Sequence, residues 1–244
     1  MSFNQTDLEG QQVVVLGGTS GIGLATAAAA AAAGADVTVA SSRKASVERA
    51  LAELPAGTAG YPVDLTDATG VRALFGDLGD IDHLIFTAGE SLFISPIGPL
   101  DLGQARRFFE LRYFGALTAA QAAAPHLRPG GSITLTTGAA LPRPRPGWSV
   151  AASVIGAVDA LTRALAVELA PLRVNAVCPG VVRSPLWNSL SDTERDEFYL
   201  TAGAGLLTGR VGEVSDIARG YLFLMTQPYA TGMVLTLDGG GVLV

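Results

Sequence analysis

Apolar runs alternate with helical patterns along the whole chain. Helical patterns stand at 21–33, 46–54, 67–78, 102–127, 147–170 and 214–225, and short runs rich in Val, Ile and Leu stand between them, at 12–17, 36–41, 60–65, 83–89, 131–138, 173–180 and 233–240. Continuous apolar strands that alternate with helices are typical of a parallel sheet covered on both faces. Because crossovers between parallel strands are right-handed, the pattern predicts a doubly wound, Rossmann-type α/β fold with about seven strands. No linker, repeat or charged tail interrupts it, so we expect one domain over residues 1–244.

The composition excludes several classes of partner and site. The chain is 49% hydrophobic and 16% charged, which excludes a disordered protein. Its net charge of −6 argues against nucleic acid, because phosphate binding needs a basic face. One cysteine, Cys178, and two histidines exclude an internal disulfide and a Cys- or His-based metal site, so we expect no metal.

The first residues predict the compartment. Residues 1–12 are polar and contain no signal-peptide core, and no apolar run reaches membrane-spanning length without Gly, Pro or a charged residue. We therefore expect a cytoplasmic protein that binds neither a membrane nor nucleic acid and acts on a small-molecule substrate.

A glycine-rich turn, GGTSGIG, joins the first strand to the first helix. Glycine lets the backbone turn tightly and approach a phosphate, and the N-terminus of the following helix offers free N–H groups to the anion. The strand–turn–helix context is the one that this mechanism requires, so the motif predicts a nucleotide site. Its expected contacts are Gly17, Thr19, Ser20, Gly21, Ile22 and Gly23.

The G-x-x-x-G-x-G spacing of this turn resembles the short-chain dehydrogenase/reductase family, and further motifs in the same order extend the resemblance over the whole chain. They are DLTD at 64–67, TAG at 87–89, LTRALAVELAPLRVNAVCPGVVRSPL at 161–186 and LDGG at 237–240. The resemblance implies a homodimer or homotetramer. It also implies that Asp64 and Leu65 hold the adenine, that the end of the fourth strand lines the cofactor, and that the nicotinamide carboxamide is bound by the loop after the sixth strand. The residues at these last two places are Ala88 and Gly89, and Pro179, Gly180, Val182 and Ser184.

The end of the second strand predicts which nicotinamide cofactor is bound. An NAD-preferring site places a carboxylate there to accept a hydrogen bond from the ribose 2′-hydroxyl. This chain has Ser41, Ser42 and Arg43 instead. Hydroxyls and a guanidinium suit a 2′-phosphate by charge and by donor geometry, so we expect NADP(H). The alternative is that Arg43 and Lys44 are a solvated surface pair.

The family's four catalytic positions are all changed in this sequence. The family uses an Asn, a Ser, and a Tyr and Lys four residues apart on one helix face. The downstream match fixes the register, which puts the Tyr position on Ala151, the Lys position on Ile155, the Ser position on Gly138 and the Asn position on Arg112. No Tyr or Lys occurs between Tyr113 and Tyr199. Without a positioned acid a factor on the order of 10²–10⁴ is lost, so ordinary carbonyl reduction through Tyr is not expected.

Few polar side chains remain as candidates near the expected site. Arg112 is the candidate catalytic residue: it cannot act as an acid, but it can hold a carboxylate or stabilise developing negative charge. The competing interpretation is a structural Arg paired to Glu110 or to a backbone carbonyl. We expect Trp148, Ala151, Ile155 and Trp187 to line the substrate pocket and residues 184–208 to form a lid over it. Arg143 and Arg145 are interpreted as surface charge.

Three functions fit this pattern. The first is an atypical NADP(H)-dependent reductase whose substrate needs no proton from Tyr, such as an iminium, because the segments ELRYFGA and RPxPGW resemble a side branch of the family that lacks Tyr and Lys. That branch includes fungal alkaloid-pathway enzymes. The second is a non-redox cyclase or isomerase that keeps the nucleotide as a structural part. The third is an inactive nucleotide-binding partner subunit.

Overall fold

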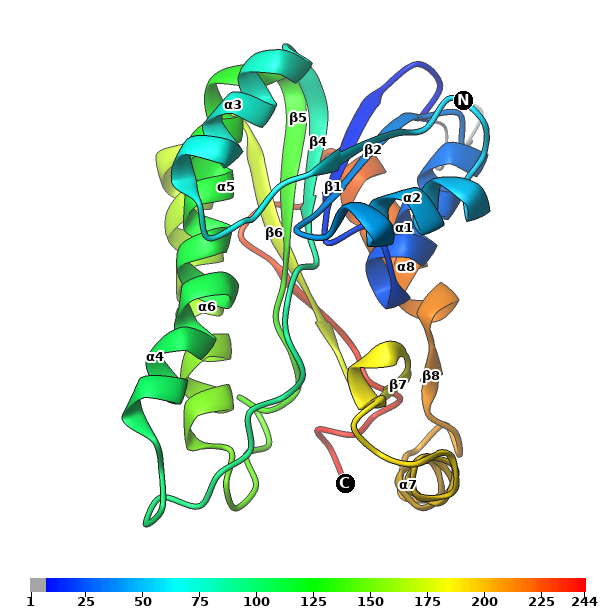
Figure 1. Ribbon diagram of the computed structural model, residues 1–244, viewed down its shortest axis with the longest axis vertical. Coiled ribbons are helices and arrows are strands. Elements are labelled where there is room, and N and C mark those ends of the chain that lie inside the picture. The colour runs from blue at the N-terminus through cyan, green and yellow to red at the C-terminus, as the bar shows by residue number, and fades with distance from the viewer. Residues whose placement is uncertain (1–7) are drawn as a thin grey trace.

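A seven-stranded parallel sheet forms the centre of the molecule. The computed structural model describes residues 8–244 (Figure 1). The strand order is β3-β2-β1-β4-β5-β6-β9, and every neighbouring pair is parallel. The strands are β1 (Gln12–Leu16), β2 (Asp36–Ser41), β3 (Ala59–Pro62), β4 (Ile81–Phe86), β5 (Leu127–Thr136), β6 (Arg173–Pro179) and β9 (Val234–Leu237). The predicted doubly wound α/β fold is therefore confirmed.

Helices cover both faces of this sheet. One layer contains α1, α2 and α8, and the other contains α3, α5 and α6 (Figure 1). A second, two-stranded sheet pairs β7 (Val182–Arg183) with β8 (Gly212–Glu213), which the sequence did not predict because each strand has only two residues. The helices are α1 (Gly21–Ala32), α2 (Lys44–Glu53), α3 (Ala68–Leu78), α4 (Leu102–Phe109), α5 (Ala116–Ala123), α6 (Ser149–Glu168), α7 (Asp192–Ala204) and α8 (Val214–Thr226).

Two predicted elements differ from the observed ones. The single helix predicted over 102–127 is interrupted by a π-helical segment, η1 (Glu110–Gly115), between α4 and α5, and ends in a 3₁₀ turn, η2 (Ala124–His126). A π-helical segment widens the helix and leaves the apolar pattern of the sequence unchanged, so periodicity does not reveal it. The strand predicted over 60–65 stops at Pro62, because Asp64 folds the chain into a turn by accepting hydrogen bonds from Thr66.

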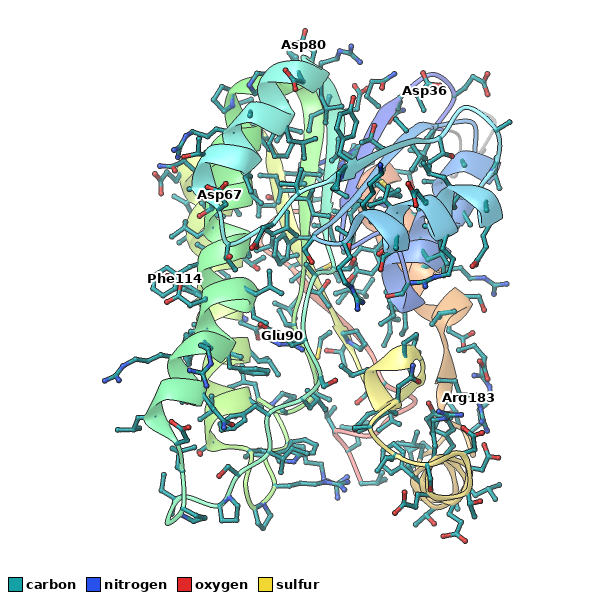
Figure 2. All side chains as sticks on the ribbon, viewed as in Figure 1. Asp36, Asp67, Asp80, Glu90, Phe114 and Arg183 are labelled. Carbon is teal, nitrogen blue, oxygen red and sulfur yellow. The ribbon has the colours of Figure 1, made fainter. Side chains whose placement is uncertain are left out.

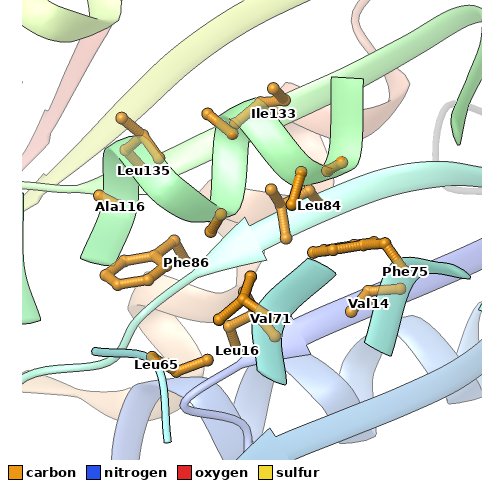
Figure 3. Close-up of a cluster of buried hydrophobic side chains, with 14 of the residues drawn as sticks. Val14, Leu16, Leu65, Val71, Phe75, Leu84, Phe86, Ala116, Ile133 and Leu135 are labelled. Atoms are coloured by element: carbon orange, nitrogen blue, oxygen red, sulfur yellow. The ribbon is translucent and has the colours of Figure 1, made fainter. Parts of the chain in front are cut away.

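Two apolar cores lie on the two faces of the sheet. One joins β1, β4 and β5 to α3 and α5, and Figure 3 shows Phe75, Leu84, Phe86, Ile133 and Leu135 from it. The other joins β1 and β2 to α1 and α8, with Tyr221 fully buried in it. Burial of this apolar surface is the main favourable contribution to folding. The two cores therefore hold the central strands in place on both faces, and this also fixes the position of the edge at which these strands end.

Helix α6 is long and apolar enough to span a membrane by length and composition alone. It packs on β6 and η1, and eight of its residues are buried inside the domain. This burial accounts for the apolar residues on one face of the helix, because the face that packs on a sheet is apolar. Helix α6 therefore has one face buried in the domain.

A buried histidine connects three segments at the amino-terminal edge of the sheet. His83 on β4 is 3% exposed, and its ring nitrogens lie 2.8 Å from Ser132 Oγ and 2.7 Å from Gln11 Oε1. Burial lowers the pKa of His83 to about 4, mainly because the charged ring loses its solvation. The folded protein therefore keeps this ring neutral at pH values at which the unfolded chain protonates it.

We predict that the His83 ring makes the protein less stable in mild acid. Since the unfolded chain binds the extra proton between pH 6.5 and about 4, the free energy of unfolding falls as pH drops through that window. The loss from this group is on the order of 2 kcal/mol at pH 5. Urea unfolding of wild type and His83→Gln at pH 7 and pH 5 measures it: the variant loses this pH-dependent part, whereas the control His126→Gln retains it. Equal acid sensitivity in wild type and His83→Gln would show that the ring is not responsible.

Candidate functional site

The glycine-rich turn packs directly against the end of β4. Gly17 has a φ of +88°, and a Cβ atom placed on it would lie 2.5 Å from the backbone nitrogen of Ala88. A Cβ atom on Gly23 would collide with the carbonyl oxygen of Gly17 and with Thr87 Oγ1. Both positions therefore require glycine for the two backbones to approach this closely. The turn lies between β1 and β4, where the strand order of the sheet reverses and α/β proteins bind their ligands.

Helix α1 starts at this turn with free N–H groups. Its N-cap residue, Ser20, is exposed and makes no side-chain cap hydrogen bond, and the first turn contains no acidic residue. An uncapped helix N-terminus next to a glycine turn suits a phosphate group. The residues present therefore fit the pyrophosphate of a dinucleotide. Of the other predicted contacts here, Thr19 is 7% exposed and Gly21 and Ile22 are half-buried.

The segment that follows β6 reaches the same turn. A Cβ atom on Gly21 would lie 3.2 Å from Cδ of Pro185, which follows directly after Ser184. Gly180 approaches the chain after β9, since a Cβ atom on it would lie 2.7 Å from the Cα of Asp238. Pro179 and Val182 are buried in β6 and β7. The structure thus brings together the glycine turn, residues 87–89 and residues 179–184, as the sequence predicted.

The predicted adenosine end of the site lies at the ends of β2 and β3. Asp64 accepts hydrogen bonds from the backbone nitrogen and hydroxyl of Thr66 at 2.9 and 2.8 Å, which lower the pKa of its carboxyl group. The next residue, Leu65, is buried. Ser41 ends β2, and exposed Ser42 and Arg43 follow it.

Helix α2 also begins without a cap. Its N-cap residue is Arg43, whose side chain makes no cap hydrogen bond, and its first turn contains no acidic residue. Lys44 in that turn pairs with Glu48 at 3.7 Å. A guanidinium beside free helix N–H groups suits an anion such as a ribose 2′-phosphate.

The positions of the family's Tyr, Lys and Ser lie among apolar groups. Ala151 is 3% exposed and belongs to a cluster with Phe108, Val150 and Val154, against which Ile155 packs. A Cβ atom on Gly138 would lie 3.3 Å from Cδ1 of Ile155, which confirms that these two positions face each other. No side chain at these three positions can give or take a proton.

Arg112, at the fourth position, lies against the end of β4. Its guanidinium donates a hydrogen bond to the backbone carbonyl of Glu90, and its Nε lies 3.5 Å from the Glu90 carboxylate. The Cζ atom of Arg112 lies 4.7 Å from the centre of the Phe108 ring. A Cβ atom on Gly89 would lie 2.8 Å from this Cζ atom. Of the two partners offered by the competing interpretation, the structure has the backbone carbonyl, whereas Glu110 is wrong, because residues two apart on a helix do not face each other.

Burial of Arg112 dominates the electrostatics of this ion pair. Burial lowers the pKa of Arg112, and the carboxylate of Glu90 partly offsets that effect. The Arg112 side chain is 21% exposed and that of Glu90 is 45% exposed, so the carboxylate is the more accessible partner. Figure 2 labels Glu90 on the segment that follows β4. The site therefore contains one accessible carboxylate that a guanidinium holds in place.

Two tryptophans stand on different segments at this edge of the sheet. Trp148 is the half-buried N-cap residue of α6, and the guanidinium of Arg145 lies 5.7 Å from the centre of its ring. Trp187 lies in a 3₁₀ turn, η3 (Pro185–Trp187), donates a hydrogen bond to the carbonyl of Val182 at 3.1 Å and packs on Phe198 of α7 at 4.5 Å. The segment 184–208 is therefore largely helical and held to β7 by Trp187, and its action as a lid stays a prediction.

Sequence reasoning missed Glu90 and the π-helical segment. Glu90 could have been found, since it follows TAG directly at the carboxyl end of a central strand, where functional side chains gather. Among residues 8–244, no group of three or more His, Cys, Asp or Glu side chains could hold a metal ion.

Comparisons with known proteins give the family. The sequence profile of the SDR-like Rossmann domain matches residues 5–244. The chain is 36% identical over 254 residues to the short-chain dehydrogenase/reductase ATR9 of Stachybotrys chlorohalonatus, covering 97% of this chain and 98% of that one. It is 31% identical to the short-chain dehydrogenase/reductase malC of Malbranchea aurantiaca, with 97% and 96% covered.

Solved structures agree with this assignment. The structure of MalC Reductase/Diels-Alderase from Malbranchea aurantiaca superposes with a TM-score of 0.91 at 30% identity, covering 98% of this chain and 99% of that one. A small-chain dehydrogenase in complex with NADPH superposes with a TM-score of 0.85 at 34% identity, with 97% and 100% covered. The glycine turn, the uncapped α1 and the matched motifs therefore have one explanation: the chain is a member of the short-chain dehydrogenase/reductase family and an SDR-like oxidoreductase.

Proposed function

We propose that this protein is an NADP(H)-dependent reductase with a non-standard active site, which reduces an imine in its iminium form. The observation that carries the proposal is the apolar cluster at the positions of the Tyr, Lys and Ser, with the Arg112–Glu90 pair as the charged group beside it. When bound, the nicotinamide would supply a hydride. Hydride addition to an iminium carbon gives a neutral amine, so no proton donor is needed, whereas a ketone would become an alkoxide that needs one.

The assignment of NADP(H) rests on the end of β2. Arg43, Ser41 and Ser42 stand beside the uncapped N-terminus of α2, where a carboxylate would indicate NAD. A similar small-chain dehydrogenase was solved with NADPH, which supports the same cofactor here. Residues 17–23 would hold the pyrophosphate, and residues 87–89 and 179–184 would line the nicotinamide side.

The preference for a cation rests on Glu90. A carboxylate that is partly exposed, and fixed by a buried guanidinium, can face a positively charged carbon–nitrogen bond without moving. Ala151 and Ile155 leave an apolar wall where the family has a phenol and an ammonium group. Removing that ammonium also removes a positive charge that would repel an iminium, and the charge that Arg112 adds is paired with Glu90.

Non-redox cyclisation is a second candidate function. A relative of similar fold is named both reductase and Diels-Alderase, so one such scaffold is associated with both activities. In that case this chain's pocket would orient a substrate between Trp148 and the lid, with the nucleotide as a structural part. An inactive partner subunit is the third possibility, and homodimer or homotetramer formation and a cytoplasmic location stay predictions of the sequence.

The cofactor assignment predicts a selective effect at Arg43. Arg43→Ala should raise the Kd of NADPH by about tenfold or more, since one charge-assisted hydrogen bond to a phosphate is lost, and leave the Kd of NADH nearly unchanged. Fluorescence titration with both nucleotides measures this. Arg49→Ala, on the same helix and bonded to Ser46, is the matched control and should change neither Kd. Equal losses for NADPH and NADH in Arg43→Ala would contradict the 2′-phosphate assignment.

The assignment of Glu90 as the group that binds the cation predicts that Glu90 and the neighbouring Arg112 guanidinium act together. With a panel of cyclic iminium salts and NADPH, Glu90→Gln should lower kcat/KM by about ten- to a hundredfold, because a charge-assisted contact to the cation is lost. Gly89→Ala should give a loss of the same kind, since its Cβ atom displaces the guanidinium that holds Glu90 while keeping both charges. Glu53→Gln, an exposed acid at the end of α2, is the control.

Two outcomes would count against this assignment. If wild type binds NADPH but oxidises it with no member of the panel, the cyclase or the inactive subunit is favoured. If Glu90→Gln retains full activity toward the same salts, the carboxylate has no role in cation binding.

A further inference from the structure

The last described residues fold back over the carboxyl edge of the sheet. Asp238 follows β9, and its carboxylate accepts hydrogen bonds from the backbone nitrogens of Gly240 at 2.9 Å and Val242 at 2.8 Å. These bonds turn the chain sharply just after the strand. We call residues 238–244 the C-terminal strap.

One side of the C-terminal strap is packed on the chain that follows α7. The backbone nitrogen of Thr208 donates to the carbonyl of Gly239 at 3.2 Å, and a Cβ atom on Gly239 would lie 2.5 Å from Thr208 Oγ1. A Cβ atom on Gly240 would lie within 2.9 Å of the side chain of Leu207. This close contact joins the strap to the far end of the predicted lid.

The other side of the C-terminal strap is bonded to the loop before α6. Arg143 Nη1 donates a hydrogen bond to the carbonyl oxygen of Gly241 at 2.7 Å, across 98 positions in the sequence. Arg143 was interpreted from the sequence as surface charge, and it is exposed, yet its guanidinium is the group that holds this loop to the strap.

The loop that contains Arg143 is stiff and is held at its other end. Pro142, Pro144 and Pro146 alternate along it, and proline fixes φ. Near its end, Ser95 donates from its backbone nitrogen to the carbonyl of Gly147 at 2.9 Å. A stiff loop that is fixed at Gly147 moves as a unit, so one bond at Arg143 can decide whether it stays in place.

The order of the strands brings three segments to the same end of the sheet: the loop before α6, the chain after β6 and the C-terminal strap. β5, β6 and β9 are neighbours in the sheet and run parallel, so the chain leaves all three at the same edge. The loop 137–148 follows β5, the segment 180–211 follows β6, and the C-terminal strap follows β9. Figure 1 shows the C-terminus between the lower end of the helices α4 and α6 and the helix α7. The strap therefore connects the two sides of the predicted substrate pocket.

We propose that the C-terminal strap closes the outer end of the substrate pocket. The Arg143–Gly241 hydrogen bond holds the strap to the loop before α6 and thereby controls access to Trp148. Trp148 lies five residues beyond Arg143 at the other end of the same loop. Arg143 is a specificity-determining residue that touches neither cofactor nor reacting atoms. By holding the loop and the strap together, it limits how freely molecules from solvent reach Trp148.

This inference concerns access to the pocket, so it does not depend on the chemistry performed there. It applies equally to a reductase, to a cyclase or to a subunit that only binds nucleotide. Its test therefore uses the free protein and a probe that is not a substrate, and its failure is distinguishable from failure of the proposed reduction.

The test is acrylamide quenching of Trp148 fluorescence, read alone in a Trp187→Phe background because the chain has only two tryptophans. In the Trp187→Phe background, the acrylamide quenching constant of Trp148 should be higher in Arg143→Ala than with Arg143 intact, because acrylamide reaches Trp148 beside the released loop. Hydrogen exchange supplies the second readout. The amides of Gly240 and Val242 should exchange about fivefold faster, as expected from the loss of one hydrogen bond of about 1 kcal/mol.

Two further variants complete the test. Asp238→Ala removes the two bonds that fold the strap, so it should reproduce both changes while Arg143 is intact. Arg72→Ala removes an exposed charge from α3, away from the strap, and should change neither readout. Unchanged quenching and unchanged exchange in Arg143→Ala would overturn the proposal, and so would equal increases in Arg72→Ala.

Discussion

The close approach of the glycine turn to the end of β4 is the constraint on which the site depends. Gly17 and Gly23 bring the backbone after β1 against Thr87 and Ala88, with no room for a side chain between them. This contact fixes the N-terminus of α1 at the point where the strand order of the sheet reverses. The same contact also positions Glu90 and its partner Arg112, because Glu90 follows Thr87 by only three residues.

On this fixed frame, the positions that align with the family's Tyr and Lys carry apolar side chains. The helix that carries the family's Tyr and Lys is present as α6, with Ala151 and Ile155 packed among apolar groups. Such packing stabilises the helix but removes every proton donor from that wall. The charged groups beside that wall are Arg112 and Glu90: the guanidinium lies over Phe108, donates a hydrogen bond to the backbone carbonyl of Glu90, and has its Nε 3.5 Å from the Glu90 carboxylate. The proposed substrate, whose positive charge hydride addition removes, would need no proton from that wall.

The sequence predicts the frame better than the site. Strands such as β1 and β6 are continuous apolar runs that alternate with helices, so the seven strands and the doubly wound topology of the main sheet could be predicted. The π-helical segment could not, because one wider turn leaves the apolar spacing of 102–127 nearly unchanged. The carboxylate beside Arg112 belongs to Glu90, which lies across space, and not to Glu110 on the same helix. Contacts such as Arg143 with Gly241 join residues 98 positions apart and have no local signal in the sequence.

The central claim is that this site delivers a hydride without delivering a proton. The most direct measurement compares an N-methylated dihydroisoquinolinium salt, which has no exchangeable proton on nitrogen, with a tetralone of nearly the same shape, under NADPH oxidation. The account predicts reduction of the salt with a kcat/KM at least about a hundredfold above that of the ketone, as expected where no general acid is present. Comparable rates for the two compounds, or reduction of the ketone alone, would show that a proton donor operates in this site and would contradict the account.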